Sequence, residues 1–207
     1  MNKLLSALAL PLAPALLLPA PLVLADEQVL REELHYVGLL ATALNHRSIG
    51  ETTKGAAWSN AGTLVVGGHL SELFHAELRA GGGLSEGTVD GELELDIDYF
   101  ASWYIGLHYP VTSYANVYGQ FGFSHISGDA ELTAKGLARQ ADPDDASPYA
   151  DLESKYPDSE FSVSWIIGAD VQVFDNAYLV LEGGRLFKDT GTGANTFQFS
   201  SGVRYEF

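Results

Sequence analysis

The sequence has no cysteine among its 207 residues, so no disulfide framework stabilises the fold. Basic residues are also scarce: 11 Lys and Arg stand against 27 Asp and Glu, which gives a formal net charge of −16. Because binding to a phosphate backbone needs a basic face, this imbalance argues against a nucleic-acid partner. Stability must therefore come from packing, from a closed hydrogen-bond ladder or from a membrane.

Long apolar runs are absent except at the amino terminus, where Leu4–Leu24 carries no charge. Four prolines interrupt this run, and each would remove a helix hydrogen bond if it formed a membrane-spanning helix. The run follows Lys3 and ends in Val23-Leu24-Ala25, the small-x-Ala pattern of a signal-peptidase site. We therefore predict a cleaved signal peptide over residues 1–25 and one mature domain over residues 26–207, with a charge of about −17.

Alternation at period 2 is the strongest pattern in the mature chain. In residues 196–207 one face carries mainly aromatic and aliphatic side chains and the other carries polar ones, with Ser201 as the single lapse. The same alternation runs through residues 92–109 and residues 160–174. It predicts strands with one apolar and one polar face. We predict eight strands, at about residues 34–44, 63–70, 74–84, 92–109, 114–126, 160–174, 177–188 and 196–207.

The connections between these strands alternate in length. The first, third, fifth and seventh have about 18, 7, 33 and 7 residues, whereas the second, fourth and sixth are tight turns. Small outer-membrane barrels have this asymmetry, with long loops outside the cell and short turns in the periplasm. The pattern predicts an all-β fold, an eight-stranded antiparallel up-and-down transmembrane β-barrel. A secreted β-sandwich or a lipocalin-like soluble barrel is the alternative.

Aromatic residues are expected to form two outward-facing girdles at the membrane surfaces. The girdle near the tight turns is predicted to contain Tyr36, Phe74, Tyr109, Tyr114, Phe174, Tyr178 and Phe207. The girdle near the long loops is predicted to contain Phe123, Phe161, Phe187 and Phe197.

Charged residues on the polar strand faces should meet inside the barrel. An eight-stranded barrel is just wide enough to be filled by side chains, and buried charges must be paired or neutralised. We expect Arg79 to pair with Asp96 or Asp98, and Arg204 to pair with Glu182. Such a network would fix the register and block conduction, whereas an incomplete one would leave a narrow, cation-preferring pore. The predicted lumenal charges are Glu77, Arg79, Asp96, Asp98, Asp170, Glu182 and Arg204.

One short motif resembles a catalytic site. His125-Ile126-Ser127 places a His and a Ser on one strand face and is similar to the motif of the outer-membrane lipid A deacylases, whose triad also has a downstream Glu, here Glu131 or Glu153. Gly128 stands where that family commonly has Asn. The motif is short, so we expect no enzymatic activity and interpret both residues as interface residues at a strand end.

Metal and cofactor sites are not expected. The other histidines lack metal-ligand spacing. The acidic residues between Asp142 and Asp158 offer hard oxygen ligands for Ca²⁺ but lack the ordered spacing of a calcium loop, so a solvated surface loop is preferred.

The segments Val117–Ser124 and Ser201–Phe207 resemble the small outer-membrane β-barrel family that includes the OmpA transmembrane domain and OmpX-like proteins. The resemblance implies a monomer in the outer membrane of a Gram-negative bacterium, in contact with outer-membrane lipid and lipopolysaccharide. It also implies that the barrel-assembly machinery recognises the terminal strand through Tyr205 and Phe207. A structural or surface-interaction role, with an extracellular ligand bound through loop 127–159, is then the first expectation.

Overall fold

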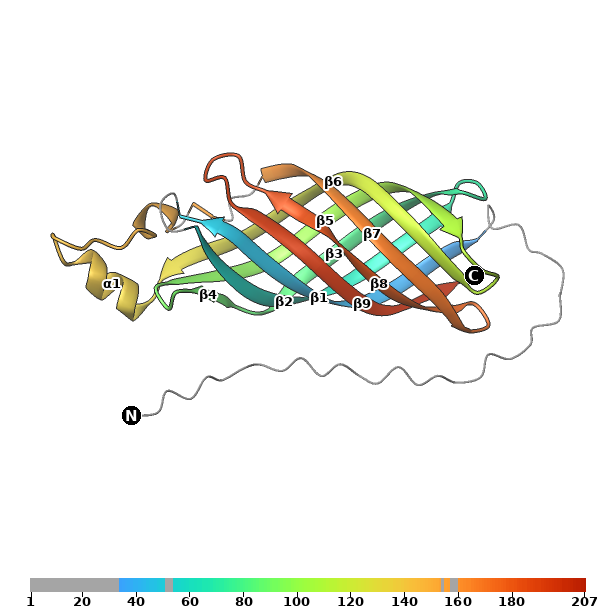
Figure 1. Ribbon diagram of the computed structural model, residues 1–207, viewed down its shortest axis with the longest axis horizontal. Coiled ribbons are helices and arrows are strands. Elements are labelled where there is room, and N and C mark those ends of the chain that lie inside the picture. The colour runs from blue at the N-terminus through green and yellow to red at the C-terminus, as the bar shows by residue number, and fades with distance from the viewer. Residues whose placement is uncertain (1–33, 51–53, 154, 157–159) are drawn as a thin grey trace.

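Eight long strands form a closed antiparallel barrel in the computed structural model, which describes residues 34–50, 54–153, 155–156 and 160–207 (Figure 1). Each strand pairs with its chain neighbour, β1 pairs with β9, and pairing between β3 and β5 completes the ring. The predicted fold is confirmed. The long strands are β1 (His35–Ile49), β2 (Gly55–His69), β3 (Phe74–Ser85), β5 (Leu93–Pro110), β6 (Ala115–Leu132), β7 (Glu160–Phe174), β8 (Ala177–Lys188) and β9 (Asn195–Glu206), and a short strand β4 (Gly87–Val89) lies beside β5.

The connections are sorted between the two barrel ends as expected. Residues 70–73, 111–114 and 175–176 make short turns at one end, here called the turn end. The other end, the loop end, carries Gly50, Lys54 and residues 86–92, 133–153, 155–156 and 189–194. The loop end also carries the helix α1 (Ala134–Gln140) and the 3₁₀ turn η2 (Ala150–Leu152), and α1 projects beyond the strands in Figure 1. None of the helices in the described residues is long and apolar enough to cross a membrane.

Two predicted loops prove to be partly strand. Residues 45–49 belong to β1 and residues 55–62 to β2. Strand β6 continues to Leu132, so the long loop begins at residue 133 instead of 127. Some of the polar residues that suggested a loop, among them His46 and Ser59, face the lumen and bind one another there. His46 Nε2, for example, lies 2.9 Å from Ser59 Oγ on the neighbouring strand.

β-Bulges change which face of a strand is apolar as it approaches the loop end. The register shifts between Arg47 and Ile49, between Ile97 and Tyr99, and between Arg185 and Phe187. A bulge adds one residue, so the side chains beyond it exchange faces. On the turn-end side of the β5 bulge, Trp103 and Ile105 point outward; beyond the bulge, apolar side chains point inward.

An apolar cluster consequently fills the barrel at the loop end. Leu93, Leu95 and Ile97 of β5 are buried there, and the segment 133–159 folds over them. Tyr149, Leu152 and Tyr156 from this segment are buried in the same cluster. The loop end is therefore built like a small water-soluble core, with apolar side chains inside, whereas the central wall is built for lipid, with apolar side chains outside.

The aromatic girdles agree with the prediction in part. At the turn end Phe74, Tyr109, Tyr114, Phe174 and Phe207 point outward and are exposed on the barrel wall. Tyr36, Tyr178 and Phe187 instead point inward and are buried, which corrects three of the predicted girdle positions. Phe187 turns inward because it follows the β8 bulge.

Candidate functional site

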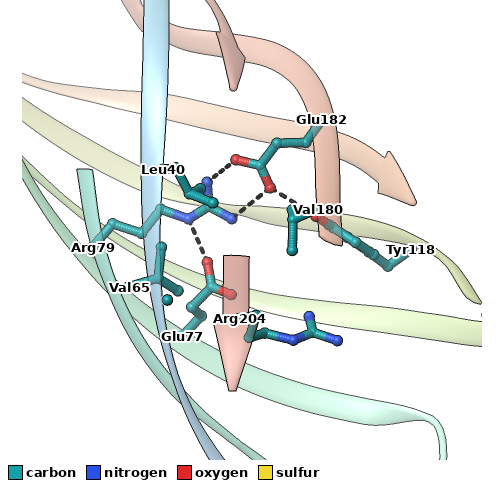
Figure 2. A pocket seen from close by; sticks show the side chains of 9 residues that line it. Leu40, Val65, Glu77, Arg79, Tyr118, Val180, Glu182 and Arg204 are labelled. Atoms are coloured by element: carbon teal, nitrogen blue, oxygen red, sulfur yellow. Dashed lines mark hydrogen bonds and ion pairs between the residues drawn. The ribbon is translucent and has the colours of Figure 1, made fainter. Parts of the chain in front are cut away.

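Arg79 of β3 is the centre of a buried charged cluster inside the barrel (Figure 2). Its Nη1 and Nη2 donate to both oxygens of Glu182 on β8, with Nη2 at 2.9 Å from Oε2. Its Nε donates to Glu77, two residues away on the same strand face. Nη2 also donates to Gln120 Oε1 on β6 at 3.1 Å. The planar guanidinium thus joins three strands, and its fork of donors matches the bidentate geometry of a carboxylate.

Two tyrosines complete this cluster by donating to its carboxylates. Tyr118 donates to Glu182 Oε2 at 2.8 Å, and Tyr36 donates to Glu77 Oε2 at 3.1 Å. Each ring lies over a glycine of the adjacent strand: a Cβ at Gly67 would stand 2.3 Å from the Tyr36 ring, and one at Gly168 would stand 2.4 Å from the Tyr118 ring. Glycine at these positions therefore lets each ring lie flat across the lumen wall and reach its carboxylate.

A second arginine, Arg204 of β9, lies nearer the turn end. Its Nη2 donates to Asp170 Oδ2 on β7 at 2.8 Å and to Glu206 Oε1 at 3.2 Å. Asn116 of β6 donates to the other oxygen of Asp170 at 2.7 Å. The Arg204 guanidinium also lies 4.9 Å from the centre of the Tyr36 ring, a cation–π distance that links the two clusters.

Five of the seven predicted lumenal charges lie inside the barrel, but their pairing differs from the prediction. Asp96 and Asp98 are exposed on the outer wall, because the β5 bulge reverses the faces at that point. Arg79 pairs with Glu77 and Glu182 instead, and Arg204 pairs with Asp170 and Glu206. Gln120 lies in the lumen, as its place on the polar face of the strand predicts. Glu206, Tyr36 and Tyr118 were not predicted to lie there, and their alternation with outward-facing neighbours is the signal that would have found them.

The lumen is closed at the height of these clusters. The cavity between them has a volume of about 10 Å³, which is room for about one water molecule. Toward the loops a layer of hydroxyl groups follows, in which Tyr104 lies 2.6 Å from Ser164 and Thr42 lies 2.8 Å from Thr63. Beyond it lies the apolar cluster of the loop end.

Three histidines line the lumen at the turn end. The ring centres of His69 and His108 are 4.8 Å apart, and those of His75 and His108 are 5.6 Å apart. His75 Nε2 lies 2.8 Å from Gln120 Nε2, so this layer is joined to the Arg79 cluster. In the part of the chain that the structure describes, no group of three or more His, Cys, Asp or Glu residues is arranged to hold a metal ion.

His125 and Ser127 share the outward face of β6, as the alternation predicts. The His125 ring lies between Tyr99 and Phe161, with ring centres 6.0 and 5.0 Å away, among the aromatic residues near the loop end. Glu131 is four residues further along the same strand, roughly 13 Å from Ser127 at the usual rise. That separation is too long for a direct hydrogen bond between them.

The segment 133–159 is fastened to the turn that precedes β5. Arg139 Nη1 lies 3.2 Å from both oxygens of Glu92, and Lys135 Nζ lies 3.2 Å from Glu92 Oε1. Burial raises the pKa of Glu92, but the hydrogen bonds from Lys135 and Arg139 outweigh this, so its pKa lies below the usual value. Arg139 also binds Asp145 at 2.7 Å, and this hydrogen bond lowers the pKa of Asp145.

Known structures share this architecture at low sequence identity. OprG of Pseudomonas aeruginosa matches with a TM-score of 0.55 and 12% identity over 84% of this chain and 95% of that one. Ail, the attachment invasion locus protein of Yersinia pestis, matches with a TM-score of 0.51 and 12% identity over 84% and 98%. Neisserial surface protein A matches with a TM-score of 0.50 and 15% identity over 84% and 97%. These likenesses support the fold alone.

No curated protein matches the sequence. The model of the outer membrane protein beta-barrel domain family, in contrast, matches residues 10–207. With the closed eight-stranded barrel and its apolar outer wall, this match confirms the predicted family and location. The chain belongs to the outer membrane protein beta-barrel domain family and is an outer-membrane protein of the Gram-negative type.

Proposed function

We propose that this protein is a non-conducting, monomeric outer-membrane barrel that presents its folded loop end, mainly residues 133–159, to partners at the cell surface. The observation that carries the proposal is the closure of the lumen at two heights. The clusters around Arg79 and Arg204 fill its middle, and the apolar cluster fills its loop end. A barrel with such a lumen has no aqueous path for solutes, so we expect its function to depend on contacts made by its external surface.

Recording in planar lipid bilayers tests the closed lumen. A gel shift between unheated and boiled samples first verifies that the purified protein is folded. The folded protein should then give no discrete conductance steps under conditions in which a general porin gives them. Steps of constant size from the wild-type protein would contradict the proposal and favour the narrow pore. Because Asp96 and Asp98 lie on the outer wall, their replacement by Asn should change nothing in these recordings.

Lipid analysis separates this proposal from the hydrolase alternative. We expect lipid A from cells that express the wild-type protein and from cells that express Ser127→Ala to have the same number of acyl chains. Loss of one acyl chain only with the wild-type protein would assign a deacylase activity to His125 and Ser127.

For assembly, we propose that the barrel-assembly machinery engages the terminal strand through outward-facing Tyr205 and Phe207. Replacing both residues by Ala should therefore lower the amount of folded barrel.

A further inference from the structure

A groove of about 900 Å³ crosses the outer wall of the barrel over β7, β8, β9 and β1, and Asn60 and Ala61 of β2 and Leu84 of β3 also line it. Cross-strand register sets small and larger side chains next to one another along its floor. One row across the four strands contains Ala43, Phe199, Gly183 and Ile167, and the next row toward the turn end contains Ala41, Ser201, Leu181 and Ala169. The volume lies within the range of about 300–1,000 Å³ that is typical of ligand pockets.

The groove is suited to hydrocarbon. Two of its polar lining residues point away from it: Thr42 binds Thr63 and Ser200 inside the lumen, and Glu182 binds Arg79 there. Asn60 and Ser201 face outward, and Asn60 Nδ2 donates to Ser85 Oγ at 3.0 Å. The strands that form the floor pair with one another through the ladder, so their backbone polar groups are satisfied. An acyl chain therefore has an apolar surface to contact and displaces no hydrogen bond.

Three cations lie immediately above this groove, on the loop-end side. Arg185 is two residues beyond Gly183 on β8 and pairs across the strands with Phe197. In the following row, Arg47 of β1 and Lys188 of β8 both flank Asn195 of β9. Adjacent strands are about 4.8 Å apart, so the backbones of Arg47 and Lys188 are roughly 10 Å apart across β9.

No carboxylate in the described residues forms an ion pair with these three cations. Arg47 donates to Asn45 and lies 5.5 Å from the centre of the Phe197 ring. Arg185 makes one long hydrogen bond, 3.4 Å, to the Val163 carbonyl, and its buried Nε has no hydrogen-bond partner. Arg79, Arg139 and Arg204, in contrast, all bind carboxylates. Three cations that have no acidic partner among the described residues offer a site of complementary charge to an anion.

The cations stand at the membrane surface. Outward-facing Trp58 and Trp165 lie in the same cross-strand row as Arg185, and aromatic residues of this kind mark the headgroup level. The bulges of β1 and β8, beyond which apolar side chains turn inward, come immediately after Arg47 and Arg185. The opposite wall at this height is acidic, since Asp96 and Asp129 face each other on β5 and β6.

We propose that this face binds one phosphorylated, acylated lipid of the outer leaflet, with its phosphate on Arg47, Arg185 and Lys188 and an acyl chain in the groove. Guanidinium groups bind phosphate through paired, charge-assisted hydrogen bonds. The acidic wall formed by β5 and β6 repels such a headgroup, so the site is one-sided. The lipid site is separate from the loop segment 133–159. The proposal depends only on the position of the barrel in the membrane, so it does not depend on the surface role proposed above.

Native mass spectrometry of the full-length mature protein in detergent tests this site, with bisphosphorylated lipid A as the probe and the same lipid stripped of phosphate for comparison. We expect one lipid to bind per chain, and we expect bisphosphorylated lipid A to bind at least tenfold more tightly than the lipid without phosphate. The double variant Arg47→Gln/Arg185→Gln should weaken binding by roughly tenfold or more, because it removes two cations that donate charge-assisted hydrogen bonds to the phosphate. Lys155→Gln, which removes one exposed charge from the loop segment, should have no effect.

A second pair of variants tests the groove. Ala43→Leu adds bulk to its floor and should also reduce lipid binding several-fold. Gly119→Leu adds the same side chain to another part of the lipid-facing wall, where no atom lies within 4 Å of the new Cβ, and should leave binding unchanged. The gel shift on boiling verifies that each variant is folded. The proposal would be overturned if the dephosphorylated lipid bound as tightly as the phosphorylated one, or if the control variants lost as much lipid binding as the test variants. It would also be overturned if the protein formed a lipid-free dimer that Ala43→Leu dissociates.

Discussion

Single buried residues decide whether the lumen of this barrel is stable. The Arg79 guanidinium neutralises Glu77 and Glu182 together, and the hydroxyl groups of Tyr36 and Tyr118 occupy further acceptor sites on these carboxylates. Two acids and one arginine leave this cluster with a formal excess of negative charge, so its hydrogen bonds matter as much as its ion pairs. Loss of any donor leaves a carboxylate in a low-dielectric interior.

We expect Arg79→Ala to lower the free energy of unfolding by about 3–5 kcal/mol, because two buried carboxylates then lose their cation. Unfolding by urea in lipid vesicles, followed by tryptophan fluorescence, measures this loss. The double variant Arg79→Met/Glu182→Gln should lose less than the sum of its two single variants, since the groups interact directly. Additive losses would mean that the two residues are energetically independent.

Glu92 should make the attachment of the loop segment sensitive to pH. Its folded-state pKa is lowered, so its contribution is complete above the unfolded-state value of about 4.3 and is lost as pH falls through the lower folded-state pKa. Amide hydrogen exchange at residues 133–141 measures the attachment after correction for the intrinsic effect of pH. In Glu92→Gln the protection should be weaker throughout and should change less with pH in this window, where Asp145, bound to Arg139, still titrates. An unchanged pH profile in that variant would rule Glu92 out as the cause.

Strand β5 shows how one residue can reverse the two faces of a whole element. Its alternation is unbroken in the sequence, which predicted that Leu93, Leu95 and Ile97 continue the lipid-facing stripe of Trp103. The extra residue at Asp98 instead turns these three side chains inward, where they are buried. A bulge leaves no mark on the hydrophobic pattern, because the pattern on either side of it remains periodic. The position of the bulge depends on the hydrogen bonds that the neighbouring strand can form with this one.

Deletion of Asp98 should disrupt the loop end while leaving the central barrel paired. The deletion moves Glu94 and Asp96 inward and exposes three apolar side chains, each worth about 1.5–3 kcal/mol when buried. We expect rapid protease cleavage within residues 133–159 and a retained gel shift on boiling. Asp98→Ala keeps the number of residues and should resist protease as the wild type does. Equal cleavage of both variants would show that the side chain, and not the register, is responsible.

At the scale of the molecule, the barrel combines two types of construction along one axis. The central wall faces lipid with apolar side chains and holds charges inside, whereas the loop end holds an apolar core inside and presents polar residues outside. The bulges of β1, β5 and β8 lie where one type gives way to the other. The membrane surface should therefore lie near these bulges, with the loop end projecting into water.

Replacement of residues 134–158 by a short Gly-Ser linker should leave the barrel folded and closed. The variant loses Tyr149, Leu152 and Tyr156 from the apolar cluster but keeps the Arg79 and Arg204 clusters that fill the middle of the lumen. We expect a lower midpoint of urea unfolding and still no conductance in planar bilayers. Conductance in this variant alone would show that the loop segment, and not the charged layer, closes the lumen.

The amino-acid sequence by itself determined the fold class, the number of long strands, the sorting of long and short connections and the inward positions of Glu77, Arg79, Asp170, Glu182 and Arg204. These features follow from local alternation, which repeats at period 2 whatever the rest of the chain does. Only the tertiary structure decided which charges pair, that Asp96 and Asp98 lie outside, and that polar stretches near His46 and Ser127 are strand. Pairing depends on contacts across strands distant in sequence, and the faces depend on bulges whose single added residue is invisible to a periodic pattern.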